Sequence, residues 1–456
     1  MQKDVKIGLE IHGYLDTNEK LFCQCKNNLS ETAPNTNICP ICTGTPGSKP
    51  MMPNAKAVTK LIQTALMLNT KINFEKSLLW QRKHYDWPDL PKGYQISMSG
   101  SHSTPLAEKG KFEGINIIEI HGEEDPAAWN PPTGEIDYNR SGVPLIEIVT
   151  SPDFHEAEIV AKWLNNLILA LSYIKSISKK AGIKVDVNIS LNKEEGKERV
   201  EIKNLHSIED IKNAINFEIQ RQEKEGTQRE TRRYDSKRGK TIKMRDKETA
   251  EDYRFIPDPD LPQLVIKEEE AEKIRNALPE TPQEKLVKLT KQHKLDKISA
   301  EILSKNLEIV EFFESVAQKV SPKFALPWIV VELMRVLNYN KKTLEEVNIK
   351  TEHFIELLQA VKENKLTELK AKQILNNFIP ISYSLKDTLK KEEKITHEEE
   401  LKKLAEQAIA QNEKAVNDYK SGKKEALSFL LGEIMKLSKK RADYAKSREI
   451  LIKLLE

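Results

Sequence analysis

Three stretches of the chain decide its fold: VKIGLEIHGYL at residues 5–15, IKVDVNISL at 183–191 and RVEIKNL at 199–205. In each stretch apolar and polar residues alternate, which is the pattern of a β-strand with one buried face. Because side chains alternate across a strand, residues two positions apart share a face. The three stretches therefore predict a sheet with one apolar face against a core and one face of polar side chains.

The polar face carries short, chemically specific side chains. In chain order they are Glu10 and His12, then Lys184, Asp186, Asn188 and Ser190, then Arg199, Glu201 and Lys203. A half-solvated antiparallel sheet shows the same alternation, and each strand alone fits that explanation. The three strands together favour a site, because carboxylate oxygens with one imidazole suit Mg²⁺ that bridges nucleotide phosphates. The sequence contains neither a P-loop nor a GxGxxG motif, so if ATP binds, it is expected to bind on the sheet surface through metal and side chains.

All four cysteines lie in one short segment. Cys23 and Cys25 form a C-x-C pair, and thirteen residues separate it from the C-P-I-C pair of Cys39 and Cys42. Thiolates on two short turns favour a tetrahedral, structural Zn²⁺ site. Disulfides are disfavoured in a chain expected in the reducing cytoplasm, and the clustering disfavours four unrelated free thiols. Iron–sulfur ligation stays open, because C-x-C is a less typical zinc spacing than C-x-x-C.

The composition fits a cytoplasmic globular protein of several domains. The 456 residues include 73 Lys+Arg and 70 Asp+Glu, so any nucleic acid must meet a local basic patch. The N-terminal segment lacks a signal-peptide pattern, and no apolar run approaches the ~18 residues that span a bilayer. From about residue 265 the chain turns rich in Lys, Glu, Leu and Ile, which predicts helices. Residues 401–456 hold 13 Lys+Arg against 8 Asp+Glu, a local basic surplus.

Two helices are expected within the first half. Apolar residues at helical spacing from Val160 to Ile174 predict a helix that begins after Pro152 and ends near Gly182. Ser207, with Asp210 three positions later, predicts the N-terminus of a second helix. The segment 228–245, QRETRRYDSKRGKTIKMR, is basic and contains Gly and Ser, which predicts a mobile loop at the entrance to the site.

Longer motifs make the chain resemble a known family. They are IGLEIHGYLDTNEKLFC at 7–23, NTNICPICTGTPGSKPMMPN at 35–54, RKHYDWPDLPKGYQIS at 82–97, HGEEDP at 121–126, DYNRSGVPLIEIVTSPDF at 137–154 and YKSGKKEALSFLLGEIMK at 419–436. In this order they resemble the motifs of the B subunit of the aspartyl/glutamyl-tRNA(Asn/Gln) amidotransferase. The resemblance extends over nearly the whole chain.

The resemblance implies an α+β fold of three domains. Residues 1–285 are expected to form an antiparallel-sheet cradle domain similar to glutamine synthetase, which also carries the zinc knot. An all-helical domain at 286–400 and a helical tRNA-binding tail at 401–456 follow. The implied enzyme is a ligase that uses ATP to phosphorylate the side-chain carboxylate of Glu or Asp misacylated on tRNA(Gln) or tRNA(Asn). Ammonia, released from glutamine by the partner amidase (the glutaminase, or A subunit), then displaces phosphate, and a small C subunit completes the heterotrimer.

The resemblance also assigns roles to single residues. Glu10 and His12 would hold Mg²⁺, and Glu124, Asp186 and Glu201 would be further catalytic ligands or outer-shell partners. Lys83, Arg140 and Lys203 would contact ATP phosphates. Cys23, Cys25, Cys39 and Cys42 would hold Zn²⁺.

Three segments depart from the family pattern. Pro126–Trp129 lacks the basic residue usual after Glu-Glu-Asp, Lys184 replaces an arginine, and the turn at 439–444 differs. An arginine's bidentate fork is lost at Lys184. Two alternatives remain: a non-catalytic zinc-containing RNA-binding or assembly protein, and a tRNA-independent carboxylate–amine ligase.

Overall fold

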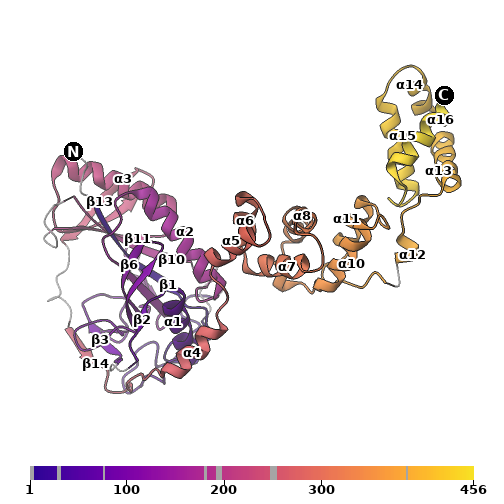
Figure 1. Ribbon diagram of the computed structural model, residues 1–456. Helices are drawn as coiled ribbons and strands as arrows, with labels where there is room; N and C mark the ends of the chain where they lie inside the picture. Colours follow the sequence, from indigo (N-terminus) through magenta and orange to yellow (C-terminus); the bar gives the residue numbers. More distant parts are fainter. Residues whose placement is uncertain are drawn as a thin grey trace. The chain divides into compact units, whose positions relative to one another are not determined.

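The computed structural model describes residues 5–27, 32–74, 78–178, 182–191, 198–246, 254–386 and 389–456. The chain forms two compact units, Met1–Thr281 and Pro282–Glu456. The first unit contains the strands and four helices, and the second contains only helices among its described elements (Figure 1). The architecture is α+β, as the sequence predicts.

A twelve-stranded mixed sheet dominates the first unit. Ten of its strands follow the order β13-β12-β11-β10-β1-β9-β6-β4-β3-β14, while β5 pairs with β6 and with β2. A separate hairpin consists of β7 and β8. The strands are β1 Lys6–Tyr14, β2 Lys71–Ile72, β3 Gln81–His84, β4 Gln95–Ser97, β5 Ala107–Phe112, β6 Ile115–Glu124, β7 Ala128–Asn130, β8 Glu135–Asp137, β9 Pro144–Thr150, β10 Ile183–Ser190, β11 Val200–Leu205, β12 Glu230–Asp235, β13 Lys240–Asp246 and β14 Arg254–Pro257.

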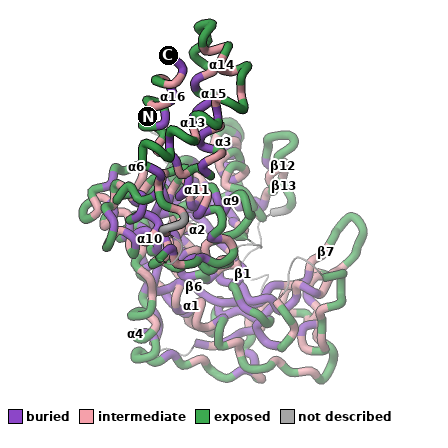
Figure 2. Tube along the Cα trace, turned by 90° about the vertical axis from the view of Figure 1, so that its right-hand side faces the viewer, coloured by how far each residue is buried: buried purple, intermediate pink, exposed green. Residues whose placement is uncertain are grey.

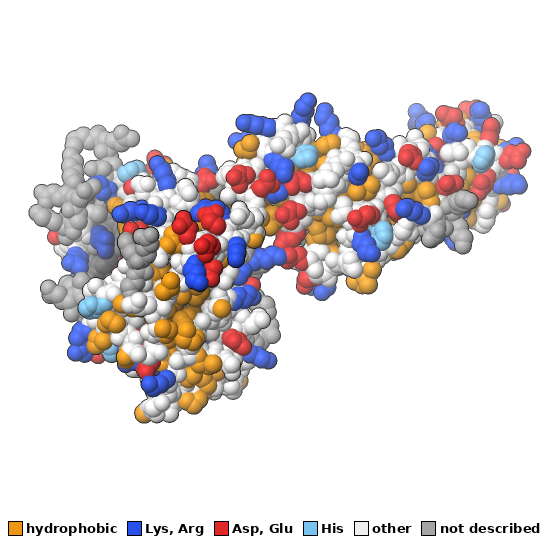
Figure 3. All heavy atoms as spheres, turned by 60° about the horizontal axis from the view of Figure 1, so that its bottom comes forward, with side chains coloured by type: hydrophobic (Ala, Val, Ile, Leu, Met, Phe, Trp, Pro, Cys, Tyr) orange, Lys and Arg blue, Asp and Glu red, His pale blue; other side chains and the backbone are white. Residues whose placement is uncertain are grey.

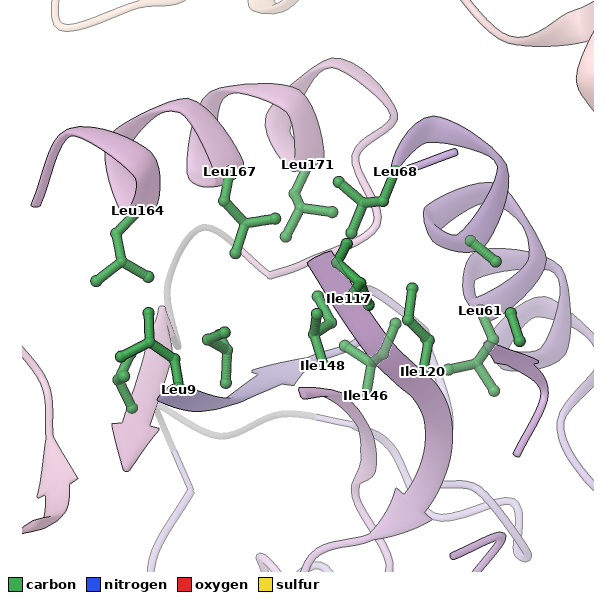
Figure 4. Close-up of a cluster of buried hydrophobic side chains, with 14 of the residues drawn as sticks. Leu9, Leu61, Leu68, Ile117, Ile120, Ile146, Ile148, Leu164, Leu167 and Leu171 are labelled. Atoms are coloured by element: carbon green, nitrogen blue, oxygen red, sulfur yellow. The ribbon is translucent and has the colours of Figure 1, made fainter. Parts of the chain in front are cut away.

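The alternation that predicts the strands also predicts their buried face. Ile7, Leu9 and Ile11 of β1 are at most 1% exposed and join the apolar residues of β10, β9 and β6 in one core cluster. Figure 4 shows leucines of α2, Ala157–Tyr173, above Leu9 and Ile148, and Leu61 of α1, Ala55–Met67, beside Ile120. Helices on the apolar face leave the other face free for polar side chains.

Both helices expected in the first unit are present. The first, α2, ends at Tyr173 rather than near Gly182; residues 179–181 of the expected end lie outside the described residues. The second, α3, spans Ile208–Glu225, and the Ser207 hydroxyl accepts a hydrogen bond from the Asp210 N–H at 3.0 Å. This contact is the N-cap that the sequence predicts.

The basic segment 228–245 is not the mobile loop that its composition predicts. It forms strands β12 and β13, joined by a short turn. A buried network anchors the hairpin to α3, since Glu218 accepts hydrogen bonds from Arg221 and from Thr241 of β13. Strand β12 runs parallel to β11, so the sheet is mixed and not wholly antiparallel.

The second unit is helical and has two apolar clusters, one from Leu289 to Leu385 and one from Ile395 to Leu455. Its helices, with α4 of the first unit, are α4 Glu268–Ala277, α5 Pro282–Lys291, α6 Lys297–Ser304, α7 Leu307–Ala317, α8 Pro322–Pro327, the π-helix η2 Trp328–Leu333, α9 Met334–Tyr339, the 3₁₀-helix η3 Leu344–Glu346, α10 Thr351–Lys362, α11 Glu368–Asn376, α12 Leu389–Glu392, α13 Glu398–Gln411, α14 Glu413–Lys420, α15 Glu425–Leu437 and α16 Tyr444–Leu455. Figure 2 shows alternating buried and exposed turns along several of these helices. Among the described residues, no helix has the length and apolarity needed to cross a bilayer.

Candidate functional site

The polar face of the sheet is continuous across five neighbouring strands, β11, β10, β1, β9 and β6. Register brings its side chains into line: Glu10 lies opposite Asp186, and His12 lies opposite Glu147. Asn188 lies opposite Glu201 on the next strand, and Glu147 opposite His121. Directly opposed residues share a face, so polar residues from distant parts of the sequence meet here.

One group of acidic side chains comes from three of these strands. Glu10, Asp186 and Glu201 each offer a carboxylate oxygen, and these oxygens lie within 4.8 Å of one another. The Asn188 side chain donates to Glu10 at 2.9 Å, and the Lys203 Nζ lies 3.1 Å from Asp186 and 3.4 Å from Glu201. Although burial opposes it, the two carboxylates raise the pKa of Lys203, which keeps this ammonium charged. We call Glu10, Asp186 and Glu201 the acidic triad.

A second group lies beside the first and contains an imidazole. The His12 Nε2 lies 3.4 Å from Glu147 and 3.8 Å from Glu123, and these three residues also meet within 4.8 Å. Burial alone would lower the pKa of His12, but the two carboxylates raise it to about 9. Burial raises the pKa of Glu123, whereas His121 and His12 outweigh burial and hold that of Glu147 well below its usual range. We call His12, Glu123 and Glu147 the histidine triad.

Both triads offer the ligand atoms that a hard divalent cation prefers. The acidic triad offers only oxygen atoms, and the histidine triad adds one nitrogen. Carboxylate oxygens suit Mg²⁺ or Mn²⁺ much better than they suit soft metals. A protonated imidazole has no lone pair to offer a metal ion. A metal cation bound at the histidine triad would therefore have to displace the proton of His12.

The structure brings together most of the site residues expected from the sequence, but not all. Glu10, Asp186, Glu201 and Lys203 meet at the acidic triad, while His12 belongs to the neighbouring triad. Glu124 lies outside both triads. It forms an ion pair with Lys92 and accepts a hydrogen bond from the Ile96 N–H at 2.9 Å.

Two further carboxylates were missed by sequence reasoning. Consecutive side chains of a strand point to opposite faces, so β6 turns Glu123 toward His12 and Glu124 away from it. Glu123 stands two positions after His121, the same spacing that places Glu10 and His12 on one face. Glu147 is the single charged residue of the apolar stretch PLIEIVT, and this interruption was the available signal.

The remaining predicted cations lie toward one end of the polar face. Lys83 is near enough to Glu123 for its charge to act on that carboxyl. Arg140 pairs with Asp125 at 2.9 Å and donates to the carbonyls of Pro126 and Ala127. Arg140 thus holds the segment in which the family's usual basic residue is missing. Trp129 of the same segment packs edge-on against Trp87, with ring centroids 5.5 Å apart.

A cavity of about 450 Å³ adjoins the acidic triad. Its lining includes Gly8, Glu10, Ile118, Val149, Asn188 and Arg199. Apolar residues form one part of this wall, and Glu10 of the acidic triad, its partner Asn188 and Arg199 form another. A planar apolar group with a charged end matches such a lining.

The four cysteines converge as their spacing predicts. Cys23, Cys25, Cys39 and Cys42 are free thiols whose sulfur atoms lie within 4.8 Å of one another. The Sγ atoms of Cys39 and Cys42 are 3.8 Å apart. A hydrogen bond from Cys23 lowers the pKa of Cys42 to about 4, while burial raises that of Cys25 to about 11. Four sulfur donors at this spacing fit a closed tetrahedral metal site.

Family models give the class to which this fold and site belong. Residues 5–272, which include the sheet, match the model described as the GatB/GatE catalytic domain, and residues 311–455 match the GatB domain. Curated relatives are named as the B subunit of aspartyl/glutamyl-tRNA(Asn/Gln) amidotransferase. The Methanopyrus kandleri protein is 42% identical over 96% of both chains, and the Methanocaldococcus jannaschii protein is 42% identical over 99% of this chain and 98% of its own. The chain belongs to this B-subunit family.

Proposed function

We propose that this protein is the tRNA-dependent amidotransferase component that activates and amidates Glu-tRNA(Gln), Asp-tRNA(Asn) or both. The observation that carries the proposal is the pair of triads side by side on one sheet face, next to a cavity of nucleoside size. Membership of the B-subunit family makes the chain a ligase that works within an assembly. The triads supply the place for phosphoryl transfer.

The proposed reaction has two chemical steps on this chain. First, the side-chain carboxylate of the aminoacyl group attacks the γ-phosphorus of ATP, the bond to ADP breaks, and an acyl phosphate forms. Ammonia then attacks the acyl carbon, phosphate leaves and one proton is lost, which gives the amide. The partner amidase, which is the A subunit, supplies ammonia from glutamine, and the small C subunit holds the two larger subunits together.

The residues of the polar face divide this work. The two triads would hold Mg²⁺, which when bound screens the charge of the triphosphate and of the leaving ADP. The cavity beside Gly8 would take the nucleoside of ATP. Lys203 fixes the carboxylates of Asp186 and Glu201, while Arg140 and Lys83 would contact phosphate oxygens. Glu124 would keep an outer role, since Lys92 already neutralises it.

The rest of the chain supports this assignment. We propose that the first unit is a cradle similar to glutamine synthetase, with Zn²⁺ at the four thiolates as a structural ion. Residues 286–400 would form a helical domain, and residues 401–456 would bind tRNA. The apolar cluster from Ile395 to Leu455 gives the tail a core of its own, which supports a separate binding module.

An amidation assay tests the function. The chain is co-purified with its amidase and small partner and supplied with ATP, Mg²⁺, glutamine and Glu-tRNA(Gln), with Asp-tRNA(Asn) in parallel. ATP-dependent conversion of either aminoacyl-tRNA is expected. A complex that binds tRNA and hydrolyses glutamine but amidates neither would favour the non-catalytic RNA-binding alternative. Turnover of ATP with free glutamate would favour the tRNA-independent ligase.

A further inference from the structure

The ammonium of Lys184 stands on the polar face beside the histidine triad. Lys184 lies opposite His12 in the pairing of β10 with β1, so both side chains share that face. Its Nζ donates to the Tyr14 hydroxyl at 2.6 Å, and it forms no ion pair with any described residue. The ammonium is partly buried, and burial lowers the pKa of Lys184 although the charge of Asp125 acts against this.

The side chains around Lys184 do not provide a carboxylate of its own to balance its positive charge. Tyr14 donates its single hydrogen to Asp125 at 2.9 Å, so it can only accept from Lys184. Asp125 is also the carboxylate partner of Arg140, at 2.9 Å. Lys184 and Arg140 therefore share Asp125, and Asp186, which also attracts Lys184, is already ion-paired with Lys203. Among the described residues, Tyr14 is its one hydrogen-bond acceptor, so two of the three N–H donors of Lys184 remain for a further partner.

The rest of the polar face carries more negative than positive charge. Lys203 is matched by two carboxylates, and the triads carry more negative than positive groups. The face is thus acidic at the triads and basic at the corner formed by Lys184 and Arg140. A group placed between them would meet a metal ion on one side and free N–H donors on the other. An anionic oxygen is the ligand that satisfies both.

We propose that Lys184, with Arg140 beside it, forms an oxyanion site for the reacting group. This inference rests on the proposed function. The anionic oxygen belongs either to the side-chain carboxylate of the aminoacyl group or to the phosphoryl group that is transferred to it. Tyr14 and Asp125 act as positioning residues, because they hold the ammonium and the guanidinium at the corner. Nothing in this role requires the two-pronged geometry of an arginine, which explains how a lysine serves here.

Two substitutions and a matched control test the site. Lys184→Met removes the charge but keeps the length of the side chain, and Lys184→Arg keeps the charge. Lys60→Met is the control, because Lys60 is a partly buried ammonium that donates to the carbonyls of Ile174 and Lys175, outside the five-strand polar face. Thermal unfolding of each full-length chain shows whether the fold is kept.

The measurements separate the two sources of the oxyanion. Calorimetry with Mg²⁺ gives the affinity of the full chain for ADP and for a non-hydrolysable ATP analogue. Steady-state amidation by the reconstituted complex gives the KM for aminoacyl-tRNA. If the oxyanion is the transferred phosphoryl group, Lys184→Met weakens the analogue about tenfold or more and leaves ADP unchanged. If it is the acceptor carboxylate, both nucleotides bind as before and the KM rises about tenfold or more.

In either case Lys184→Arg should recover most of the loss, and Lys60→Met should show none. Unchanged nucleotide affinity together with unchanged amidation kinetics in a folded Lys184→Met chain would overturn the oxyanion site alone. A wild-type chain that binds neither nucleotide would overturn the proposed function and this inference with it. Equal losses in Lys184→Met and Lys184→Arg would also count against a role that depends on charge.

Discussion

Gly8 controls how much room the cavity beside the acidic triad offers. It lies in β1, two positions before Glu10, and lines the cavity. A Cβ atom here would lie 3.5 Å from the Thr150 carbonyl oxygen and 3.6 Å from Pro152, which are ordinary contact distances. Packing therefore does not require a glycine at position 8. The open space of the cavity, which a side chain would fill, explains why a glycine is present.

We expect Gly8→Val to reduce the affinity for Mg²⁺·ATP by about tenfold or more while the fold persists. Valine suits a strand, but its methyl groups would occupy space proposed for the nucleoside. Calorimetry on the full chain measures the affinity, and Gly432→Val is the control. Gly432 is exposed on α15 with open space around it, so its substitution should leave nucleotide affinity unchanged. Equal affinity of the Gly8 variant and wild type would place the nucleoside elsewhere.

Single residues also show where sequence reasoning reaches its limit. Alternation alone correctly separated the buried face from the polar face, because it depends only on neighbours along one strand. Alternation along β6 separates Glu123 from Glu124, but the residue that Glu123 meets depends on the neighbouring strands and their register, and no local pattern encodes that. His12 and Glu147 meet only because β1 pairs with β9. Membership of a strand was predictable, whereas the partner across the sheet was not.

The cysteine segment should depend on its metal. We expect Cys39→Ser to lose the zinc and to lower the free energy of unfolding by about 3–5 kcal/mol, because three thiolates no longer complete a tetrahedron. Metal analysis gives the zinc content, and urea unfolding followed by tryptophan fluorescence gives the stability. Four of the five tryptophans lie in the first unit, so the signal reports mainly on it.

Ser48→Ala is the control for the cysteine variant. The Ser48 hydroxyl donates to the carbonyl of Pro40 within the same segment, so its loss disturbs the loop but removes no thiolate. This variant should retain one zinc per chain. A wild-type chain that contains iron instead of zinc, or whose thiols react only after reduction, would contradict the structural zinc site.

Helix α16 of the tail depends on Asp443 in two ways. Its Oδ1 accepts the Lys446 N–H at 3.1 Å as an N-cap, and its Oδ2 pairs with Lys394 at 2.8 Å. Burial opposes ionisation, but these contacts outweigh it and lower the pKa of Asp443. A carboxyl with a lowered folded-state pKa contributes stability above its unfolded-state value, and that contribution is lost as the pH falls through the folded-state value.

Asp443→Ala should therefore destabilise the tail by about 1 kcal/mol at pH 7, the usual cost of losing an N-cap. Asp443→Asn keeps a capping oxygen and removes only the charge, so its cost should be smaller. The difference between wild type and Asp443→Asn should shrink as the pH falls below about 4, the unfolded-state pKa of aspartate. Urea unfolding followed by circular dichroism at pH 7, and at a series of pH values below 4, measures both. A difference that grows with acidity would refute this account of the ion pair.

Helices and strands were predicted best where the evidence for them lies within a few neighbouring residues of the sequence. The N-cap of α3 was found because Ser207 and Asp210 lie three positions apart. The end of α2 at Tyr173 was missed by several residues, since the apolar pattern continues into Ile174 beyond the helix. The hairpin of β12 and β13 was taken for a loop because its Arg and Lys content looks solvated. Arg232 is instead neutralised by Glu218 of helix α3 and by Glu230 of β12 itself.

Charge over the protein as a whole gives little guidance to tRNA binding. On the face drawn in Figure 3, blue Lys and Arg side chains alternate with red Asp and Glu over the helical unit, and no single-sign field covers it. The net charge of +3 agrees with this mixture. Under the proposed function, affinity for tRNA must then come from local groups. Lys424, Lys439 and Lys440 are exposed in the tail, at the turns before and after α15.

Catalysis and tRNA binding should therefore separate by mutation. We expect Glu10→Gln to abolish amidation and leave tRNA affinity unchanged, because Glu10 belongs to the acidic triad and lies in the other unit. Replacing Lys424, Lys439 and Lys440 together by alanine should weaken tRNA binding and reduce the slope of log affinity against log salt by about one for each phosphate that the chain no longer neutralises. Mg²⁺·ATP affinity should be unchanged in the triple variant, since the cavity does not involve the tail. Filter binding across a salt series, calorimetry and the amidation assay measure the three quantities.

Glu113→Gln is the control for the catalytic variant, because Glu113 is exposed in the turn between β5 and β6, outside both triads. It should amidate like wild type. If Glu10→Gln amidates normally, the acidic triad does not serve the reaction, and the fold would be a binding platform for chemistry done elsewhere in the assembly. If the triple variant keeps the full salt slope, the tRNA phosphates meet a different surface. Two results are needed together: Glu10→Gln loses amidation but keeps tRNA binding, and the triple lysine variant loses tRNA binding but keeps Mg²⁺·ATP binding. Only this combination shows that the sheet carries out the chemistry and the tail binds tRNA.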